Sequence, residues 1–314
     1  KNKNKFLGKM EHKPGYITVV GSAAVDTIET AQGRVENCLG GSVSFVGAVG
    51  GLFAPIHIIA IVGDDFPMQE YDFLKERGVN LDGLEVAEGK TFHWEGKYHD
   101  DMNQRDTLAT ELGVFEGFDP KLTKEAMRAE YLLLANINPE LQLNVMTQIK
   151  KPRFTVFDTM NLWININLDG VKKMLGKVDM VTLNDEEVFL LTNENSLLKG
   201  ARKLLEFGPK YVVVKKGEHG SILVGKDGAP FLCPAYPITD PIDPTGAGDT
   251  FAGAMLGYLA STSDLGPFNV RRAVVYGTVA ASFTVEAFGV ERLKTLTHEE
   301  LNARYRTFQE MVEF

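Results

Sequence analysis

The chain has 314 residues, of which 44% are hydrophobic and 24% charged, and its formal net charge is −9. This composition excludes a disordered or fibrous protein, and the acidic excess argues against nucleic acid or an anionic membrane as a partner. No apolar run approaches the roughly 20 residues that a membrane-spanning helix needs. The two cysteines, Cys38 and Cys233, lie far apart and match no metal spacing, which fits a reducing cytoplasm, so we expect a cytoplasmic α/β protein.

The amino terminus is basic and polar. It begins with the letters KNKNK and lacks both the apolar core and the cleavage site of a secretory signal. We therefore expect a flexible tail over residues 1–15 and a single domain over residues 16–314.

Short apolar segments alternate with segments of helical periodicity along most of the chain. Strands are expected at 16–21, 56–62, 131–134, 154–158, 180–183 and 211–215. Helices are expected at 42–52, 67–77, 139–150, 185–191 and 196–207, with three long helices after Pro244. This alternation predicts a mostly parallel sheet with helices on both faces.

One region breaks the alternation. Residues 90–115 mix polar and aromatic side chains in a pattern typical of a β ribbon, and with residues 26–38 they are expected to form a small sheet over one edge of the domain. We call these two segments the lid, since such a sheet is suited to excluding water from a reactive phosphate. The alternative is an extension that only mediates contact between two copies, and the two roles are compatible.

Two nucleotide-binding patterns nearly occur, and both are rejected. Residues 220–226 match most of a P-loop, but Asp227 stands where Ser or Thr is required, and the following turn predicts a β hairpin. Residues 246–248 begin like a dinucleotide fingerprint, but Phe251 occupies the third glycine position. A nicotinamide-dependent enzyme is therefore not expected.

The most informative segment is 243–251, with the letters DPTGAGDTF. Gly246, Ala247 and Gly248 carry little or no side chain, so an anion can approach their N–H groups at a helix start, where the helix dipole favours it. Asp249 would repel a bound phosphate. Its presence there is explained if it takes a proton from an attacking hydroxyl, so the segment predicts phosphoryl transfer.

The segment 243–253 resembles the carboxyl-terminal signature of the ribokinase-like (PfkB) family of sugar and nucleoside kinases, and the resemblance extends from about Tyr16 to the end. It implies a three-layer α/β fold with a mostly parallel central sheet, helices on both faces and a small β lid. It also implies transfer of the γ-phosphoryl of ATP to a primary hydroxyl of a sugar or nucleoside. By this resemblance Asp249 is the catalytic base, and the backbone of residues 246–248 forms an anion hole.

On the acceptor side, the resemblance assigns Asp26 to substrate hydroxyls and Gly40 and Gly41 to the backbone against which the substrate ring lies. The sequence departs from the family four residues later, where Phe45 replaces an Asn that binds sugar hydroxyls. Phe45 either packs within its helix or faces a less polar or aromatic ligand, so the usual recognition of ribose is not expected.

For metal ions, the resemblance assigns Asn184 and Glu187 to Mg²⁺ and its waters, with a merely exposed glutamate in a first helical turn as the alternative. It assigns Asp243 and Thr245 to a monovalent cation. The implied cofactors are ATP and Mg²⁺, with K⁺ as an option.

For ATP, the resemblance assigns Lys215, Gly217 and Gly220 to a turn that lines the nucleotide site. A solvated lysine is the alternative for Lys215. Thr245 is expected beside the nucleotide and Thr278 beside its base.

The acceptor is left open between a free sugar and a nucleoside. Aromatic side chains in the lid offer stacking surfaces, although ordinary packing is the alternative; they are Phe92, His93, Trp94, Tyr98 and His99. Two further alternatives are an adenosine-kinase-like nucleoside kinase and a non-catalytic sensor. A sensor needs no carboxylate beside phosphate, which argues against it. The expected partner is a small sugar or nucleoside, with a homodimer through the lid as an option from the family.

Overall fold

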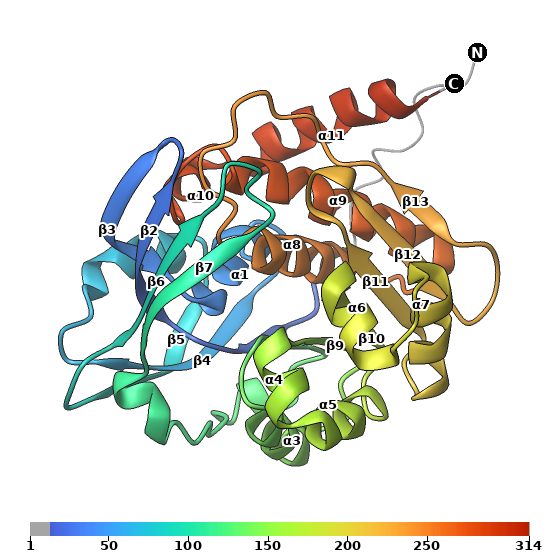
Figure 1. The fold of residues 1–314 in the computed structure, drawn as a ribbon. Helices are drawn as coiled ribbons and strands as arrows, with labels where there is room; N and C mark the ends of the chain where they lie inside the picture. Colours follow the sequence, from blue (N-terminus) through green and yellow to red (C-terminus); the bar gives the residue numbers. More distant parts are fainter. Residues whose placement is uncertain (1–12, 314) are drawn as a thin grey trace.

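The structure, a computed structural model, describes residues 13–313 and contains a large sheet and a separate small one (Figure 1). The nine-stranded sheet has the order β13-β12-β11-β10-β9-β8-β1-β4-β5. Its strands are β1 (Ile17–Val20), β4 (Ile56–Gly63), β5 (Asn80–Ala87), β8 (Tyr131–Leu134), β9 (Phe154–Asp158), β10 (Met180–Asn184), β11 (Tyr211–Lys215), β12 (Ser221–Gly225) and β13 (Phe231–Cys233). Only the pairs that β12 makes are antiparallel, which confirms the mostly parallel sheet.

Helices cover both faces of this sheet, and each face has its own apolar core. Consecutive residues Val19 and Val20 of β1 belong to different cores, because successive side chains of a strand point to opposite faces. One core includes α1 (Ser42–Gly50), α2 (Asp72–Glu76), α8 (Ala247–Thr262), α9 (Pro267–Thr284), α10 (Glu291–Thr295) and α11 (His298–Val312). The other includes α3 (Pro139–Gln148), α4 (Asn161–Ile166), α5 (Leu168–Leu175), α6 (Asp185–Thr192) and α7 (Leu197–Glu206).

Several elements differ from the expectation. The helix predicted at 67–77 is a 3₁₀ turn at Met68–Tyr71 followed by α2. Strand β5 and helices α4 and α5 were not predicted; β5 is a partly exposed edge strand without a continuous apolar run, so its pattern is weak. Most of the predicted tail, residues 1–12, lies outside the described residues. Within residues 13–313 no helix is long and apolar enough to cross a membrane.

The small sheet has the order β3-β2-β6-β7 and contains the two segments expected to form the lid. Its strands are β2 (Ala24–Thr30), β3 (Gly33–Gly40), β6 (Phe92–Tyr98) and β7 (Arg105–Glu111). Figure 1 shows it beside the large sheet, with the β6–β7 hairpin reaching toward the start of α8. At its base, Asp65 Oδ1 accepts hydrogen bonds from the N–H and hydroxyl of Thr91 at 2.8 and 2.7 Å, which ties β6 to the turn after β4.

The two faces of the small sheet carry different side chains. The outer face carries ion pairs between strands: Lys97 of β6 with Glu29 of the neighbouring β2 at 2.7 Å, and Arg34 of β3 with Glu95 of β6, across β2, at 3.0 Å. Asp26 and Trp94 are in register on β2 and β6 and lie on the opposite, inner face. The inner face of the small sheet is therefore turned toward the large sheet, and the outer face with its ion pairs is turned toward solvent.

Candidate active site

The start of α8 is held in shape by a glycine and a buried ring. Gly246 is the N-cap residue with φ 76°, and a Cβ there would lie 2.3 Å from the ring of Phe45. Phe45 is only 1% exposed, so its ring lies under the loop and does not face a ligand. The structure therefore favours the packing interpretation of Phe45, which was predicted among the substrate-binding residues.

Backbone donors at this helix start are mostly unoccupied. The N–H of Ala247 donates to the carbonyl of Pro244 at 3.2 Å. Within residues 13–313 the N–H groups of Gly246, Gly248 and Asp249 have no hydrogen-bond acceptor. Of the donors predicted at 246–248, the Ala247 amide is therefore unavailable, because it is used in a turn, and the Asp249 amide is an additional donor. Three donors at the positive end of a 16-residue helix suit an anion.

Asp249, the third residue of α8, is half-buried beside these donors. In the described part of the chain its carboxyl has no hydrogen-bond donor. Burial raises its pKa to about 7, the neighbouring carboxylate of Asp158 adds to this effect, and Lys215 opposes it. A carboxyl that titrates near neutral pH is well matched to accept a proton during catalysis.

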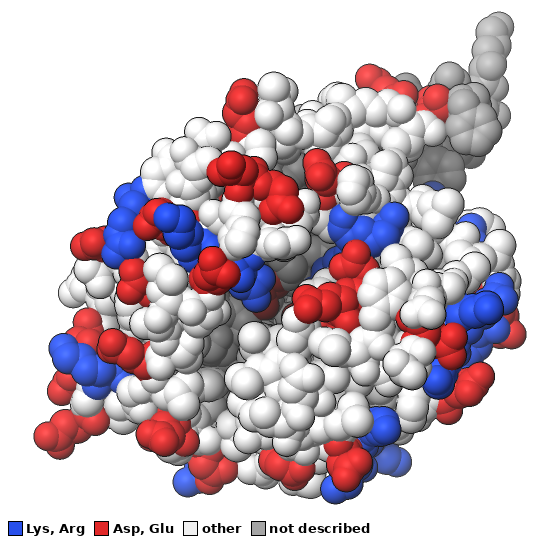
Figure 2. Space-filling view, viewed as in Figure 1, with Lys and Arg blue, Asp and Glu red and all other residues white. Residues whose placement is uncertain are grey.

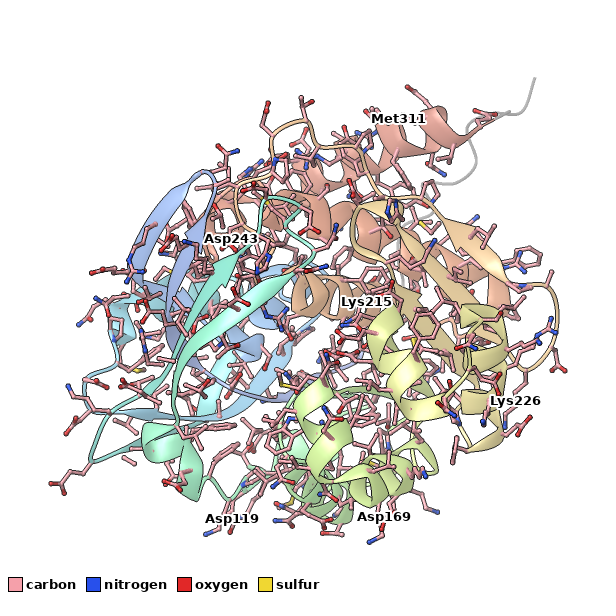
Figure 3. All side chains as sticks on the ribbon, viewed as in Figure 1. Asp119, Asp169, Lys215, Lys226, Asp243 and Met311 are labelled. Carbon is pink, nitrogen blue, oxygen red and sulfur yellow. The ribbon has the colours of Figure 1, made fainter. Side chains whose placement is uncertain are left out.

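Lys215 brings a cation to the same place. It ends β11, and its Nζ lies 3.3 Å from Oδ1 of Asp158, which ends β9. A Cβ on Gly248 would lie 3.1 Å from that Nζ, so the ammonium group borders the first turn of α8. Lys215 is labelled near the centre of Figure 3. Because its side chain is 21% exposed and ion-paired, the solvated-lysine alternative is wrong.

Three carboxylates share this single ammonium group. Burial by itself lowers the pKa of Lys215, but Asp158, Glu187 and Asp249 outweigh it, and the net effect is a raised pKa. Lys215 is therefore charged at neutral pH, and its positive charge is available beside the free amides.

Sequence reasoning missed Asp158. The residue was predicted only as the end of a strand, although Asn184 ends the adjacent parallel strand β10 and Lys215 ends β11, the strand beyond it. Since the carboxyl ends of parallel strands meet at one edge, this clustering was a usable signal. In the fold, Thr182 donates to Asp158 Oδ1 at 2.7 Å, and Gln142 donates to its backbone carbonyl at 3.1 Å.

Asn184 and Glu187 form a reciprocal helix cap at the start of α6. Glu187 N–H donates to Asn184 Oδ1 at 2.8 Å, and Asn184 N–H donates to Glu187 Oε2 at 2.8 Å. Glu187 is only 6% exposed, so the exposed-residue alternative is wrong. Burial raises its pKa to about 7; Lys215 opposes this and Asp158 adds to it. No group of three or more potential metal-ligating His, Cys, Asp or Glu side chains occurs within residues 13–313.

Asp26 places a buried acceptor on the inner face of the lid. It is 4% exposed, and within the described residues its Oδ1 has no hydrogen-bond partner. Close packing surrounds it: a Cβ on Gly40 would lie 2.0 Å from Oδ2. Gly41, with φ 80°, begins the turn into α1, and a Cβ there would lie 2.6 Å from the Ala24 nitrogen. An unpaired buried carboxylate oxygen is costly unless a ligand supplies a donor.

We expect Asp26→Asn to stabilise the protein at high pH. Burial and the neighbouring Asp243 raise the pKa of the Asp26 carboxyl from 3.8 to about 7. Between these values the folded protein holds a proton that the unfolded chain has lost, so its stability falls as pH rises through this window. Asn cannot ionise. Without ligand, the free energy of unfolding of the Asp26→Asn variant should exceed that of wild type by about 1–3 kcal/mol above pH 7.

Urea unfolding of both proteins near pH 4 and near pH 8 measures this difference. The advantage of Asn should be small near pH 4, because there Asp26 is protonated in the folded protein and its ionisation in the unfolded chain is only partial. An equal difference at both pH values would contradict the burial argument.

Asp243 and Thr245 join the loop before α8 to two other segments. Asp243 is fully buried; Oδ1 accepts from the Thr245 N–H and Oδ2 from the Gly289 N–H, both at 2.9 Å. Burial raises its pKa. The Thr245 hydroxyl donates to the hydroxyl of Tyr98 on β6 at 3.1 Å, so the lid contacts the same loop. Figure 3 labels Asp243 on the lid side of α8.

The remaining predicted residues lie around β12 and β13. A Cβ on Gly220 would lie 2.1 Å from the carbonyl oxygen of Cys233, and the Thr278 hydroxyl lies 3.4 Å from the Cys233 thiol. Gly217 is exposed, and a Cβ there would lie 2.5 Å from Oδ1 of Asn103 in the β6–β7 hairpin. The hairpin tip therefore meets the turn after β11 across the start of α8.

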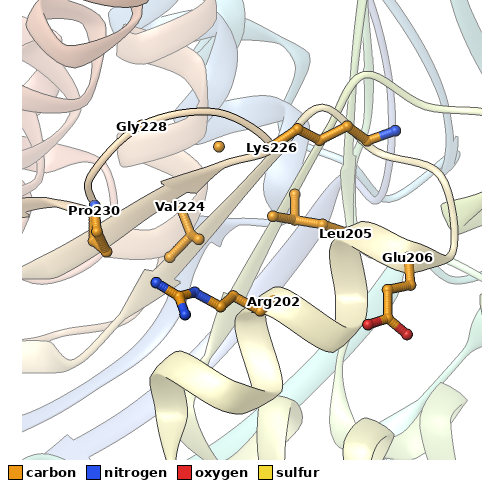
Figure 4. Close-up of a pocket in the computed structure, with 8 residues that line it drawn as sticks. Arg202, Leu205, Glu206, Val224, Lys226, Gly228 and Pro230 are labelled. Carbon is orange, nitrogen blue, oxygen red and sulfur yellow. The ribbon is translucent and has the colours of Figure 1, made fainter.

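The surface is hollowed near the middle of the face in Figure 2, between the β6–β7 hairpin and helices α4 and α6, with acidic and basic side chains on its rim. Two separate surface pockets contain none of the predicted site residues. One of ≈ 490 Å³ lies between α7 and the β12–β13 hairpin (Figure 4), and one of ≈ 740 Å³ lies between α9 and α11. Neither pocket is lined by Asp249 or by the charged residues near it, Asp158, Glu187 and Lys215.

Comparisons with known proteins agree on one family. Residues 15–295 match the family described as "pfkB family carbohydrate kinase". A cytidine kinase of Thermococcus kodakarensis is 30% identical over 246 residues, covering 76% of this chain and 87% of that protein. Among solved structures, a nucleoside kinase of Methanocaldococcus jannaschii superposes with a TM-score of 0.74 at 22% identity, over 94% of this chain and 99% of that one. A Vibrio cholerae fructokinase with fructose, ADP and potassium bound gives 0.76 at 20% identity, over 93% and 99%.

Proposed function

Since this chain belongs to the pfkB family of carbohydrate kinases and is an ATP-dependent sugar or nucleoside kinase, we propose that Asp249 is its catalytic base and that the start of α8 is its anion hole. The acceptor is a primary hydroxyl of a sugar or of the sugar part of a nucleoside. The observation that carries the proposal is the half-buried Asp249 carboxyl, which has a pKa of about 7 and, among residues 13–313, no hydrogen-bond donor, beside three amides that have no acceptor in the same part of the chain.

In the proposed reaction, Asp249 accepts the proton of the acceptor hydroxyl while the hydroxyl oxygen forms a bond to the γ-phosphorus of ATP. The bond from that phosphorus to the β–γ bridging oxygen breaks, ADP leaves, and the proton later passes to solvent. Negative charge on the transferring group is stabilised by the N–H groups of Gly246, Gly248 and Asp249 and by the Lys215 ammonium group. These donors are fixed before the reaction by the Phe45 packing and by the Asp158 ion pair.

The acceptor would be positioned by Asp26. Its orphaned Oδ1 can accept a hydrogen bond from a substrate hydroxyl, which would remove the cost of leaving that oxygen unpaired. At Gly41 a Cβ would lie 2.6 Å from the Ala24 nitrogen and from the Ser22 carbonyl oxygen, so only glycine fits this turn beside Asp26; contact of a sugar ring with this backbone stays a prediction.

Two places near this centre carry oxygen donors for metal ions. For Mg²⁺ they are Asn184 and Glu187, whose side chains also cap α6, together with the carboxylate of Asp158; nucleotide phosphates and water would complete such a site. Mg²⁺ would supply charge neutralisation of those phosphates. Asp243 is a buried carboxylate whose oxygens each have one N–H donor, so a monovalent cation such as K⁺ could share it with Thr245. A homodimer through the lid stays a prediction, which light scattering can measure.

An acceptor panel tests the proposed function. Purified protein with ATP and Mg²⁺ is given ribose, fructose, cytidine, adenosine and other candidates, and both ADP and the phosphorylated acceptor are measured. We expect equal amounts of both products with at least one acceptor. Saturable binding of nucleotide and acceptor without either product would support the sensor alternative instead.

A further inference from the structure

The aromatic side chains of the lid divide by face and by partner. His93 is on the outer face, where its Nε2 lies 3.0 Å from the Thr27 hydroxyl. Tyr98 is on the inner face but is buried and bound to Thr245. Neither ring can receive a flat ligand in the hollow.

Two other lid rings also have partners. Phe92 stacks on Phe115, with ring centroids 5.4 Å apart and planes 22° apart. His99 lies at the end of the hairpin and its Nε2 is 3.0 Å from the Asp106 carboxylate. Of the five predicted stacking residues, only Trp94 is left on the inner face without an aromatic or buried partner in the described structure.

Trp94 is fixed on one side, and an exposed, displaceable side chain lies over its ring. One side of its indole covers Gly96, where a Cβ would lie 2.0 Å from Cη2. Its Nε1 donates to the Thr107 hydroxyl at 3.3 Å, which fixes the orientation of the ring. The exposed Arg105 side chain lies over the ring with its guanidinium carbon 5.9 Å from the ring centroid, near the roughly 6 Å limit of a cation–π contact. Because such a contact is weak at an exposed site, a planar ligand can replace Arg105 on this rigid, half-buried ring.

The position of Trp94 relative to Asp26 indicates what would use this surface. The two residues are paired in register on neighbouring parallel strands, which lie about 4.8 Å apart. A ligand whose hydroxyls donate hydrogen bonds to Asp26 therefore has its next substituent within reach of the indole. In a nucleoside, a planar base is bonded directly to the hydroxyl-bearing ribose.

Resting on the proposed function, we infer that the acceptor is a nucleoside, with its ribose at Asp26 and its base stacked on Trp94. A nucleoside gains binding energy by stacking on the indole, which needs no hydrogen bond to a particular base. A free sugar has no planar group that could stack there.

Fluorescence can test the contact directly, because the chain has two tryptophans. Trp163→Phe leaves Trp94 as the only indole. With excitation at the red edge of the indole absorption, cytidine and adenosine should change its emission saturably, with a midpoint that matches their KM, whereas ribose should not. Unchanged emission in a variant that still phosphorylates nucleosides would overturn the inference.

Kinetics supply a second test that a merely structural role would not satisfy. Trp94→Ala should raise the KM for nucleosides about 5- to 150-fold, the range expected for one lost stacking contact, with little change in kcat or in the KM for ATP. Trp94→Phe should restore most of the affinity, and His93→Ala, on the outer face of the same strand, should leave all constants unchanged.

The outcomes separate this inference from the proposed function. If wild type phosphorylates ribose or fructose at least as well as any nucleoside, the kinase function stands and the Trp94 assignment fails. The assignment also fails if Trp94→Ala remains folded and keeps its KM for nucleosides. If wild type transfers phosphate from ATP to no acceptor, the proposed function fails.

Discussion

Replacing Asp249 with Asn is expected to lower kcat by about two to four orders of magnitude, the range typical of losing a general base. Asn has the size of Asp but cannot accept the proton of the attacking hydroxyl at neutral pH. The amides at the start of α8 are untouched, so the affinity for ATP should change little. Steady-state kinetics with the preferred acceptor and calorimetric titration with ATP measure the two quantities separately.

The pH dependence of activity is the control for the Asp249→Asn variant. Burial and the Asp158 carboxylate raise the pKa of Asp249 to about 7, and only its ionised form can act as a base. Wild-type kcat/KM for the acceptor should therefore rise with pH through about 7, whereas the residual activity of Asp249→Asn should lack this step. An Asn variant within tenfold of wild-type kcat would remove Asp249 from the role of base.

Replacing Gly246 with Ala is expected to lower kcat by about 100- to 1,000-fold, the effect of losing an oxyanion donor. The residue has φ 76°, and the new Cβ would lie 2.3 Å from the ring of Phe45. A left-handed backbone costs an L-residue about 1–2 kcal/mol, and the steric clash adds to this cost. The loop must therefore move, and the N–H groups of Gly246 and Gly248 would leave their places beside the phosphoryl group.

A second substitution at Phe45 separates the clash from the backbone strain. Phe45→Leu removes most of the ring, so the double variant with Gly246→Ala should recover part of the lost kcat. The single variants and the double variant form a cycle whose coupling reports the direct contact. Thermal unfolding confirms that each protein is folded. Full activity in Gly246→Ala alone would contradict the proposed anion hole.

Elements with a strong local pattern were predictable. The strands that became β1, β4, β8, β9, β10 and β11 are largely apolar runs, because both faces of the sheet are covered and all positions except some strand ends are buried. The glycine-rich start of α8 was equally visible, since a free helix terminus needs small residues wherever an anion approaches. Edge strand β5 and the short helices α4 and α5 were missed because their burial depends on neighbours distant in the sequence.

The sequence by itself determined the class of chemistry, because a carboxylate and a run of small residues at one helix start are local features. Only the tertiary structure decided the surroundings of that carboxylate. Phe45 is 201 positions from Gly246 and Asp158 is 57 from Lys215, yet each pair is in contact. Asp26 and Trp94 likewise become neighbours only when β2 and β6 pair. Such contacts arise from strand order and close packing, which no local pattern of residues encodes.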